Sequence, residues 1–218
     1  MDSPEVIERV AGHAGELVLR KVAGHHEVIA NGTFLMDTRN GESERLLVDA
    51  AADRMPAGGA MLLGGLGVGY SLRRALDHAR VGEVIVVERE PTVVSWNRGP
   101  LRAYHGDALA DARTTLVVAD LLGWIATTTK RFDAICLDID NGPEWIVDEG
   151  NAELYGEWGL GRLGALLTPG GVLAVWSAGA ATAFTRRLER HFAEVTVLSV
   201  PVPRGQPDLV FLGVGWTG

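Results

Sequence analysis

The chain has 218 residues, of which 47% are hydrophobic, and its 20 Lys and Arg against 28 Asp and Glu give a formal net charge of −8. The acidic balance argues against a nucleic-acid-binding surface, which needs clustered Lys and Arg. No run approaches the ~18–20 uninterrupted apolar residues of a membrane span, the first residues lack a signal-peptide pattern, and the single cysteine, Cys136, excludes a disulfide within the chain. We therefore expect a cytoplasmic protein that contacts neither nucleic acid nor membrane.

The first quarter of the chain is predicted to be rich in β-structure. Residues 16–22 (ELVLRKV) and 26–39 (HEVIANGTFLMDTR) have strand patterns, with NGT as a hairpin turn. Residues 43–55 (SERLLVDAAADRM) have helical spacing, with Ser43 as the expected N-cap. Because PAGG follows this helix, we predict a hairpin-and-helix extension over residues 1–56 and a second domain over residues 57–218.

From Ala60 onward, short apolar runs alternate with helical segments. The runs are AMLLGG, VGEVIVVE, TTLVVAD, FDAICLDI and GGVLAVWSA. Such runs are typical of strands buried on both faces, and their alternation with helices indicates a parallel sheet. The last two runs, EVTVLSVPV and DLVFLGVGW, are separated only by PRGQP, which is too short for a helical crossover, so they should pair antiparallel. The pattern predicts an α/β, Rossmann-like methyltransferase fold: a mostly parallel seven-stranded sheet with an antiparallel last strand, plus the N-terminal β-rich extension.

A cluster of glycines marks the turn from the first of these strands into a helix. Backbone N–H groups at a helix N-terminus can approach a ligand only where no Cβ atom stands in the way. The sequence MLLGGLGVGYSL therefore predicts a cofactor-binding turn formed by Gly64, Gly65, Gly67 and Gly69.

Acidic residues end the next two predicted strands. Glu88 stands nineteen residues after Gly69, where a carboxylate can accept hydrogen bonds from both hydroxyls of a ribose. Asp120, followed by Leu121, ends the third strand, where an adenine would lie. The alternative is that these strands simply end in polar residues.

The spacing G-x-G-x-G differs from the NAD fingerprint and no P-loop is present, so we expect S-adenosylmethionine or its decarboxylated form.

The sequence resembles the spermidine synthases (polyamine aminopropyltransferases). The resemblance includes NGTFLMDTRNGESERLL, LLGGLGVGYSLRRAL, VVEREPTVVSWNRGPL and FDAICLDIDNGPEW. It implies transfer of an aminopropyl group from decarboxylated S-adenosylmethionine to a small amine or polyamine. It also implies that donor and acceptor meet at the acidic end of the fourth strand, and that the chain forms a homodimer through its N-terminal hairpin.

At that strand end, Asp138 is the predicted general base, because an acceptor amine must lose a proton before it attacks. Asp140 is the second candidate, and Asn141 is expected to contact substrate. The alternative is that Asp138 only caps the turn into NGP. In the family, a glycine followed by Asp ends the first motif, and Leu66 and Gly67 stand there in this chain. A second Asp follows the fourth strand in the family, and Asn141 stands at that place here. In the family, these two Asp residues hold the ammonium of the aminopropyl group. Methyl transfer from S-adenosylmethionine and a non-catalytic relative of the fold therefore remain as alternatives.

Several aromatic residues complete the expectations. Trp145, Tyr155 and Trp158 follow the acidic loop and are predicted either to wall an amine site or to cover the sheet edge. Tyr70, at the glycine turn, is expected to line the donor pocket. Trp96, Trp124 and Trp176 lie in apolar patterns and are predicted core residues, and no metal site is expected because the adjacent histidines His25 and His26 lack partners at ligand spacing.

Overall fold

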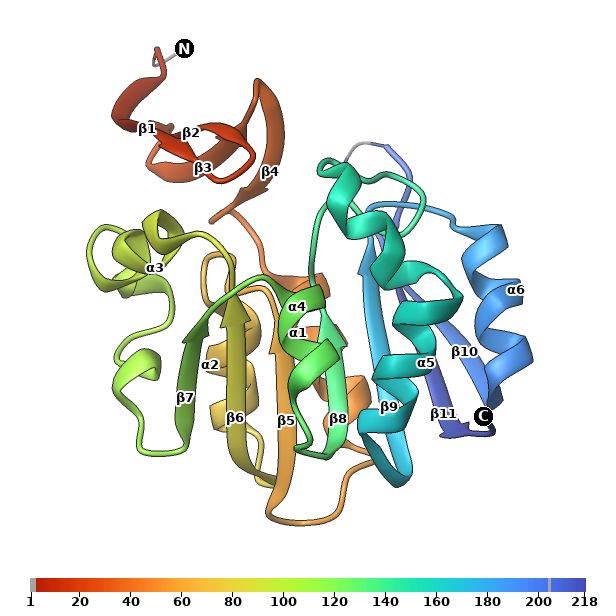
Figure 1. Ribbon diagram of the computed structural model, residues 1–218. Coiled ribbons are helices and arrows are strands. Elements are labelled where there is room, and N and C mark those ends of the chain that lie inside the picture. Colours follow the sequence, from red (N-terminus) through yellow and green to blue (C-terminus); the bar gives the residue numbers. More distant parts are fainter. Residues whose placement is uncertain (1–2, 204) are drawn as a thin grey trace.

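The structure, a computed structural model, describes residues 3–203 and 205–218. Its N-terminal part is a four-stranded antiparallel sheet in the order β1-β2-β3-β4 (Figure 1). Asn31 and Gly32, which join the third and fourth strands, have φ values of 49° and 79°. Positive φ at both positions of a two-residue turn matches the twist of a hairpin, so the predicted NGT hairpin is confirmed. The strands are β1 (Glu5–Gly12), β2 (Gly15–Val22), β3 (His25–Ala30) and β4 (Thr33–Asp37).

Strand β1 was not predicted from the sequence. Most of its side chains are exposed, including Val6 and Ile7, so no apolar alternation marks it. Its conformation depends on antiparallel pairing with β2, which is a contact with a neighbouring strand rather than a property of its own sequence.

The rest of the chain forms a seven-stranded sheet in the order β10-β11-β9-β8-β5-β6-β7. Strands β5 to β9 pair in parallel, and β11 is antiparallel to both β9 and β10. The predicted fold class, including the antiparallel last strand, is therefore confirmed. The strands are β5 (Gly59–Gly64), β6 (Val81–Glu88), β7 (Thr114–Val118), β8 (Phe132–Leu137), β9 (Leu167–Ser177), β10 (Phe192–Val200) and β11 (Asp208–Trp216).

Helices cover both faces of this sheet (Figure 1). Along β5, Met61 and Leu63 point to the face packed by α1, α2 and α3, whereas Leu62 points to the face packed by α4, α5 and α6. This alternation is what two-sided burial of a parallel sheet requires. The helices are α1 (Glu42–Ala52), α2 (Tyr70–Asp77), α3 (Pro91–Arg98), α4 (Leu121–Thr127), α5 (Glu157–Leu166) and α6 (Thr182–His191), with short 3₁₀ turns at Arg102–Tyr104, Ala108–Ala110 and Glu149–Tyr155.

Helix α1 belongs by its packing to the larger sheet. Leu47 and Val48 are fully buried in the same cluster as the inner residues of β5 and β9, although the helix lies on the N-terminal side of the predicted domain boundary. The boundary between residues 56 and 57 stays a prediction. The expected N-cap was wrong: α1 begins at Glu42 after Gly41, and the Ser43 hydroxyl bonds elsewhere.

The N-terminal sheet lies beyond the carboxyl ends of the parallel strands (Figure 1). Hydrogen bonds between described residues help to hold it there: the His13 amide donates to Glu90 at 2.9 Å, the Trp96 indole donates to Glu8 at 2.6 Å, and His26 Nδ1 lies 3.0 Å from the Tyr104 hydroxyl. The two sheets thereby enclose the edge at which ligands bind in open α/β sheets.

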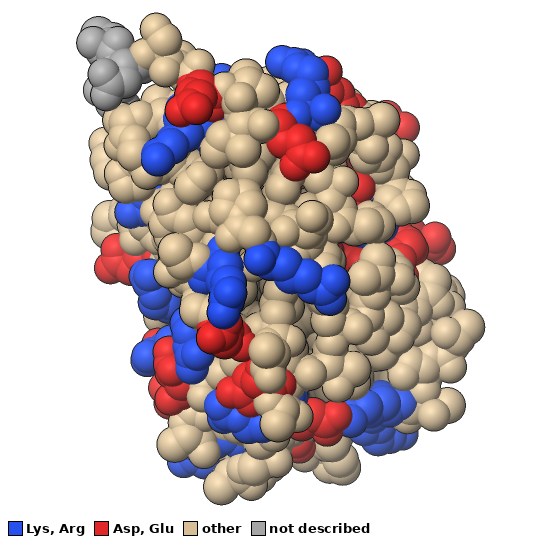
Figure 2. Space-filling view, turned by 90° about the vertical axis from the view of Figure 1, so that its left-hand side faces the viewer, with Lys and Arg blue, Asp and Glu red and all other residues tan. Residues whose placement is uncertain are grey.

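The outer surface on the side that carries α3 and β7 has acidic and basic side chains interspersed, without a continuous patch of one sign (Figure 2). Within the described ranges, no helix has the length and apolar content to cross a membrane.

Candidate functional site

A cavity of about 840 Å³ lies between the N-terminal sheet and the carboxyl ends of the parallel strands. That volume falls within the range of small-molecule sites, which is roughly 300–1,000 Å³. Two parts of its lining have different chemistry. We call the first the glycine-turn half and the second the carboxylate half; they comprise Gly65, Gly67, Glu88, Asp120 and Leu121, and Glu44, Asp138, Asn141, Trp176 and Asp208, respectively.

The four predicted glycines serve different purposes. Gly65 and Gly67 line the cavity, whereas Gly64 and Gly69 are absent from its described lining. A Cβ at Gly64 would lie 2.8 Å from the Leu121 side chain, and one at Gly69 would lie 2.6 Å from the His105 ring. These two glycines therefore permit close internal packing.

Gly67 is the glycine whose position suits a ligand. Its φ is 55°, and among the described residues the one heavy atom within 4 Å of a Cβ added there would be Met36 Sδ, at 3.5 Å. The carbonyl of Gly67 accepts a hydrogen bond from the buried Asn97 side chain at 2.8 Å, which fixes the turn from behind. The backbone at this position is thus rigidly held and open on the cavity side.

Glu88 is 9% exposed and faces the cavity at the end of β6. Its carboxylate accepts hydrogen bonds from the Leu66 amide at 2.9 Å and the Glu90 amide at 2.8 Å, so it shapes the glycine turn as well. Burial raises the pKa of Glu88. Each oxygen keeps a second lone pair, so the group can still accept hydroxyl hydrogens from a ribose.

The two carboxylate oxygens of Asp120 make different contacts. One of its oxygens accepts a hydrogen bond from the Gly123 amide at 2.9 Å and caps α4. This structural role is the alternative given above, in which the strand simply ends in a polar residue. Its other oxygen lies 4.0 Å from the Arg89 guanidinium, and Arg89 also pairs with Asp148 at 2.5 Å. Asp120, Leu121 and Glu88 all line the same cavity as the glycine turn, and their role in holding a cofactor stays a prediction.

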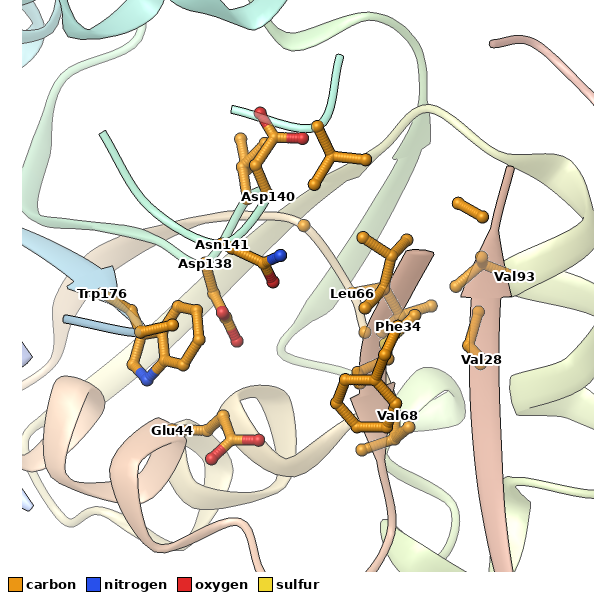
Figure 3. Close-up of a pocket in the computed structure, with 18 of the residues that line it drawn as sticks. Val28, Phe34, Glu44, Leu66, Val68, Val93, Asp138, Asp140, Asn141 and Trp176 are labelled. Carbon is orange, nitrogen blue, oxygen red and sulfur yellow. The ribbon is translucent and has the colours of Figure 1, made fainter. Parts of the chain in front are cut away.

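Asp138 follows β8 directly, and its carboxylate points into the cavity toward Trp176 and Glu44 (Figure 3). Burial, and then the negative charges of Glu44 and Asp208, raise the pKa of Asp138 to about 8. A carboxylate with a raised pKa is a stronger base than an exposed one, which suits proton transfer near neutral pH.

Asp140 and Asn141, the two residues after Ile139, differ in where their side chains lie relative to Asp138. Asp140 has a positive φ of 56°, and its carboxylate accepts the Asp148 amide at 3.3 Å and the Asn151 side chain at 2.9 Å. It points away from Asp138 (Figure 3), so its oxygens serve the loop. Asn141, 5% exposed, lies beside Asp138 and lines the cavity.

Sequence reasoning missed Glu44 and Asp208. The Ser43 hydroxyl lies 2.8 Å from Asp208 Oδ2 and 3.0 Å from Glu44 Oε2, which joins the start of α1 to the start of β11. The signal for Asp208 was present: because β11 runs antiparallel, its first residue lies at the same edge as the last residues of the parallel strands. Glu44 has no such signal, because acids are common on the first turn of any helix.

Of the aromatic residues predicted near the site, some line the cavity and others do not. Tyr70 and Trp145 line the cavity; the Tyr70 hydroxyl donates to the Thr38 carbonyl at 3.0 Å, and Trp145 is 59% exposed. Tyr155 is 1% exposed, does not appear in the described lining, and donates from its hydroxyl to the Ile139 carbonyl at 2.8 Å. Trp158 is likewise absent from that lining.

Three other expectations concerned core residues. Trp176 packs partly buried against the core, as predicted, and it also lines the cavity. Trp96 is 1% exposed, as predicted, and Trp124 packs partly buried against the core. Cys136 is also buried, and burial raises the pKa of its thiol.

The charges around the cavity are unevenly balanced. Two described arginines line it, Arg39 and Arg89, and both are paired with carboxylates: Arg39 with Glu27 and Asp37, and Arg89 with Asp148. Within residues 3–203 and 205–218, no group of three or more His, Cys, Asp or Glu is arranged to hold a metal ion. Because both of these arginines are already paired, the Glu44, Asp138 and Asp208 carboxylates of the carboxylate half suit a positively charged ligand such as an amine.

Comparison with known proteins identifies relatives that are named polyamine aminopropyltransferases. The chain is 31% identical over 113 residues to the polyamine aminopropyltransferase of Sulfolobus acidocaldarius, a match that covers 52% of this chain and 36% of the relative. It is 27% identical over 190 residues to polyamine aminopropyltransferase 1 of Hyperthermus butylicus, covering 84% and 63%. The chain thus matches between about a third and two thirds of the length of these relatives.

Solved structures share the fold. A spermidine synthase in complex with the transition state analogue AdoDATO matches with a TM-score of 0.82 at 18% identity, over 96% of this chain and 73% of that chain. The spermidine synthase of Thermotoga maritima matches with a TM-score of 0.77 at 17% identity, over 96% and 72%. The family model described as the spermine/spermidine synthase domain matches residues 45–203. This match spans most of the chain and confirms the resemblance found in the sequence: the chain belongs to the spermine/spermidine synthase domain family.

Proposed function

We propose that this protein transfers an aminopropyl group from decarboxylated S-adenosylmethionine to a small amine or polyamine, with Asp138 as the general base. One observation carries the proposal: the Asp138 carboxylate faces a cavity between a turn suited to a nucleoside and a group of carboxylates suited to an amine. Family membership supports it, as do the names of the similar polyamine aminopropyltransferases.

The residues of the glycine-turn half fit the donor. Gly67 leaves room for close approach to the backbone, and Glu88 keeps lone pairs for the two ribose hydroxyls. Asp120 and Leu121 would face the adenine. When bound, the donor supplies a propyl carbon activated by a sulfonium centre.

Asp138 then handles the proton of the acceptor. A free alkyl ammonium has a pKa of about 10, close to that of lysine, and cannot attack while protonated. The raised pKa of Asp138 brings the carboxylate nearer to that value, so it can take the proton as the amine nitrogen bonds to the propyl carbon. The carbon–sulfur bond breaks with its electron pair on sulfur, which leaves neutral methylthioadenosine and the extended amine.

The proposal is tested by product analysis. Purified protein mixed with decarboxylated S-adenosylmethionine and 1,4-diaminobutane should release methylthioadenosine and a triamine in equal amounts, detected by mass spectrometry. The same mixture with Asp138→Asn protein is the control. No methylthioadenosine across a panel of amines, with donor binding verified by calorimetry, would refute aminopropyl transfer.

Methyl transfer is the second candidate, because the glycine turn has no carboxylate at Leu66 or Gly67 and Asn141 is neutral. A donor that keeps its own carboxylate would be less repelled there. Release of S-adenosylhomocysteine from S-adenosylmethionine and an amine, without methylthioadenosine from the decarboxylated form, would identify this reaction.

Two wider expectations accompany the proposal. A homodimer is expected through the N-terminal sheet, and a cytoplasmic location is expected from composition. Light scattering on the purified protein checks the first, and localisation of a tagged chain checks the second.

A further inference from the structure

Helix α3 lies next to the N-terminal sheet (Figure 1) and contacts both that sheet and the glycine turn. Asn97, in its last turn, donates from its side-chain amide to the Gly67 carbonyl at 2.8 Å and to the Val93 carbonyl at 2.9 Å. The preceding residue, Trp96, donates from its indole to Glu8 of β1 at 2.6 Å. One residue of the helix therefore holds the glycine turn, and its neighbour holds the N-terminal sheet.

The same arrangement recurs after α3, in the 3₁₀ turn and the residue that follows it. The His105 ring packs against the glycine turn, since a Cβ added to Gly69 would lie 2.6 Å from it. The preceding residue, Tyr104, has its hydroxyl 3.0 Å from Nδ1 of His26 in β3, and the two rings meet edge to face. His105 Nε2 also lies 3.0 Å from the Asn97 carbonyl, so the two residues behind the turn hold each other.

Asn97 determines which way one peptide group of the turn points. Because the peptide between Gly67 and Val68 is trans and planar, its C=O and its N–H point in opposite directions. The C=O points to Asn97, which is fully buried, so the Val68 amide points away from Asn97, and both Gly67 and Val68 line the cavity. An amide fixed in this way needs no rearrangement before it meets a ligand, which favours binding.

The Asn97–His105 pair depends on its surroundings. Burial lowers the pKa of His105, which keeps the ring neutral near pH 7. Because Nε2 faces a carbonyl oxygen, it carries the hydrogen of the ring and leaves Nδ1 as an acceptor. Neither His105 Nδ1 nor Asn97 Oδ1 has a hydrogen-bond partner among the described residues. Buried groups with unused acceptors are costly, so the pair keeps its place through the contacts on either side of it.

We infer that Asn97 and His105 are positioning residues for the nucleoside donor. The N-terminal sheet holds them through their neighbours Trp96 and Tyr104, so the docking of this sheet sets the donor affinity. None of these four residues belongs to the described lining of the cavity, and each therefore acts through the glycine turn rather than by contact with the ligand. This inference rests on the proposed function, which supplies the donor.

The first test measures nucleoside binding by calorimetry with methylthioadenosine. Asn97→Leu keeps the side-chain volume but removes the donor to the Gly67 carbonyl, so Kd should rise about tenfold or more. The KM for the amine should change less than about threefold, because the carboxylate half is untouched. An unchanged Kd would overturn the inference.

Tyr155→Phe is the matched control for the first test. It also removes a hydrogen bond of a buried side chain behind the cavity, but one that supports the loop after Asp138. It should lower Tm and leave the Kd of methylthioadenosine unchanged. A rise in Kd as large as that of Asn97→Leu would show that any loss of stability weakens binding, which would overturn the positioning role.

The second test acts from the N-terminal sheet. Trp96→Phe keeps an aromatic ring but removes the N–H that donates to Glu8, and Glu8→Gln removes the charge of the acceptor. Each should raise the Kd of methylthioadenosine about three- to tenfold. Arg9→Gln is the matched control, because Arg9 is the exposed neighbour of Glu8 on β1 and pairs with Glu16 inside the same sheet. Equal Kd values for Glu8→Gln and Arg9→Gln would overturn the role of sheet docking.

Hydrogen exchange of the free protein reports on the turn without a ligand. A peptide covering residues 60–72 should exchange faster in Asn97→Leu and Glu8→Gln proteins than in wild-type and Arg9→Gln proteins. The inference and the proposed function fail separately. Methylthioadenosine formed from the donor, with Kd unchanged in every variant, overturns the inference and keeps aminopropyl transfer. Weaker nucleoside binding in the variants, without methylthioadenosine formed by the wild-type protein, keeps the positioning role and refutes the transfer.

Discussion

In the glycine-turn half of the cavity, the carboxylates already serve the protein's own backbone. Glu88 accepts two backbone amides and Asp120 caps α4, so each is fixed in place before any ligand arrives. In the carboxylate half, Glu44 and Asp208 share one serine hydroxyl, and Asp138 accepts no hydrogen bond from the described residues. A rigid half suits recognition of an invariant nucleoside, and a charged half with spare acceptors suits a cation and proton transfer.

The largest effect should come from the reacting group of the carboxylate half. Asp138→Asn preserves shape but removes charge and basicity, so turnover should fall by ~10²–10⁴ while donor affinity stays unchanged. Part of the lost rate should return at high pH, where some of the acceptor amine is already neutral. Steady-state kinetics over a pH series, with donor binding by calorimetry, measures both. A fully active variant would discard Asp138 as the base, although Asp140 would be a weak substitute because the loop uses its oxygens.

The glycine-turn half can be blocked selectively. Gly67→Ala places a methyl group at the open cavity wall, so donor affinity should fall about tenfold or more. Gly106→Ala is the matched control. The φ of Gly106, 62°, is close to the 55° of Gly67, its Cβ would meet none of the described residues within 4 Å, and it is absent from the described lining of the cavity. Both variants carry a similar backbone cost of roughly 1–2 kcal/mol. Equal donor affinity in the two variants would show that Gly67 serves only the turn.

The raised pKa of Asp138 in the carboxylate half should make the Tm of the protein depend on pH. The pKa of Asp138 is raised above its unfolded value of about 3.9, so its contribution to stability is complete below that pH and declines as the pH rises toward about 8. Asn at this position has no such penalty. Asp138→Asn should therefore raise Tm more at about pH 9 than at about pH 5, by about 4–8 °C if the difference is about 2 kcal/mol. Parallel Tm curves for the two proteins would contradict the raised pKa.

The smallest effect should come from a residue behind the site. Tyr155→Phe removes the hydrogen bond to the Ile139 carbonyl in the loop that follows Asp138, at a cost of about 1 kcal/mol. We expect a lower Tm and a modest fall in kcat with KM for the amine unchanged, because the buried ring does not line the cavity. A rise of about tenfold or more in the KM for the amine would restore the direct substrate contact predicted from the sequence.

Much of the fold was readable in the sequence because its signals are local. Each parallel strand is a short apolar run ended by a polar residue, and the PRGQP linker is too short for a crossover, so the sheet and its antiparallel last strand follow directly. The order Gly67, Glu88, Asp120 and Asp138 follows from the same rule, since parallel strands present their ends at one edge. Strand β1 escaped prediction because its stability depends on its partner strand and on few buried side chains.

The carboxylate half was decided only by the tertiary structure. Ser43 and Asp208 are 165 residues apart in sequence and meet because α1 packs under the sheet while β11 runs in reverse beside β9. Trp176 lies in an apolar pattern that indicates core, yet it sits at the strand end that opens onto the cavity. Asp140 follows Asp138 by two residues, but a positive φ turns it into the loop. Local patterns identify the strand ends, whereas the side chains that converge on one space depend on packing between distant segments, which no local pattern encodes.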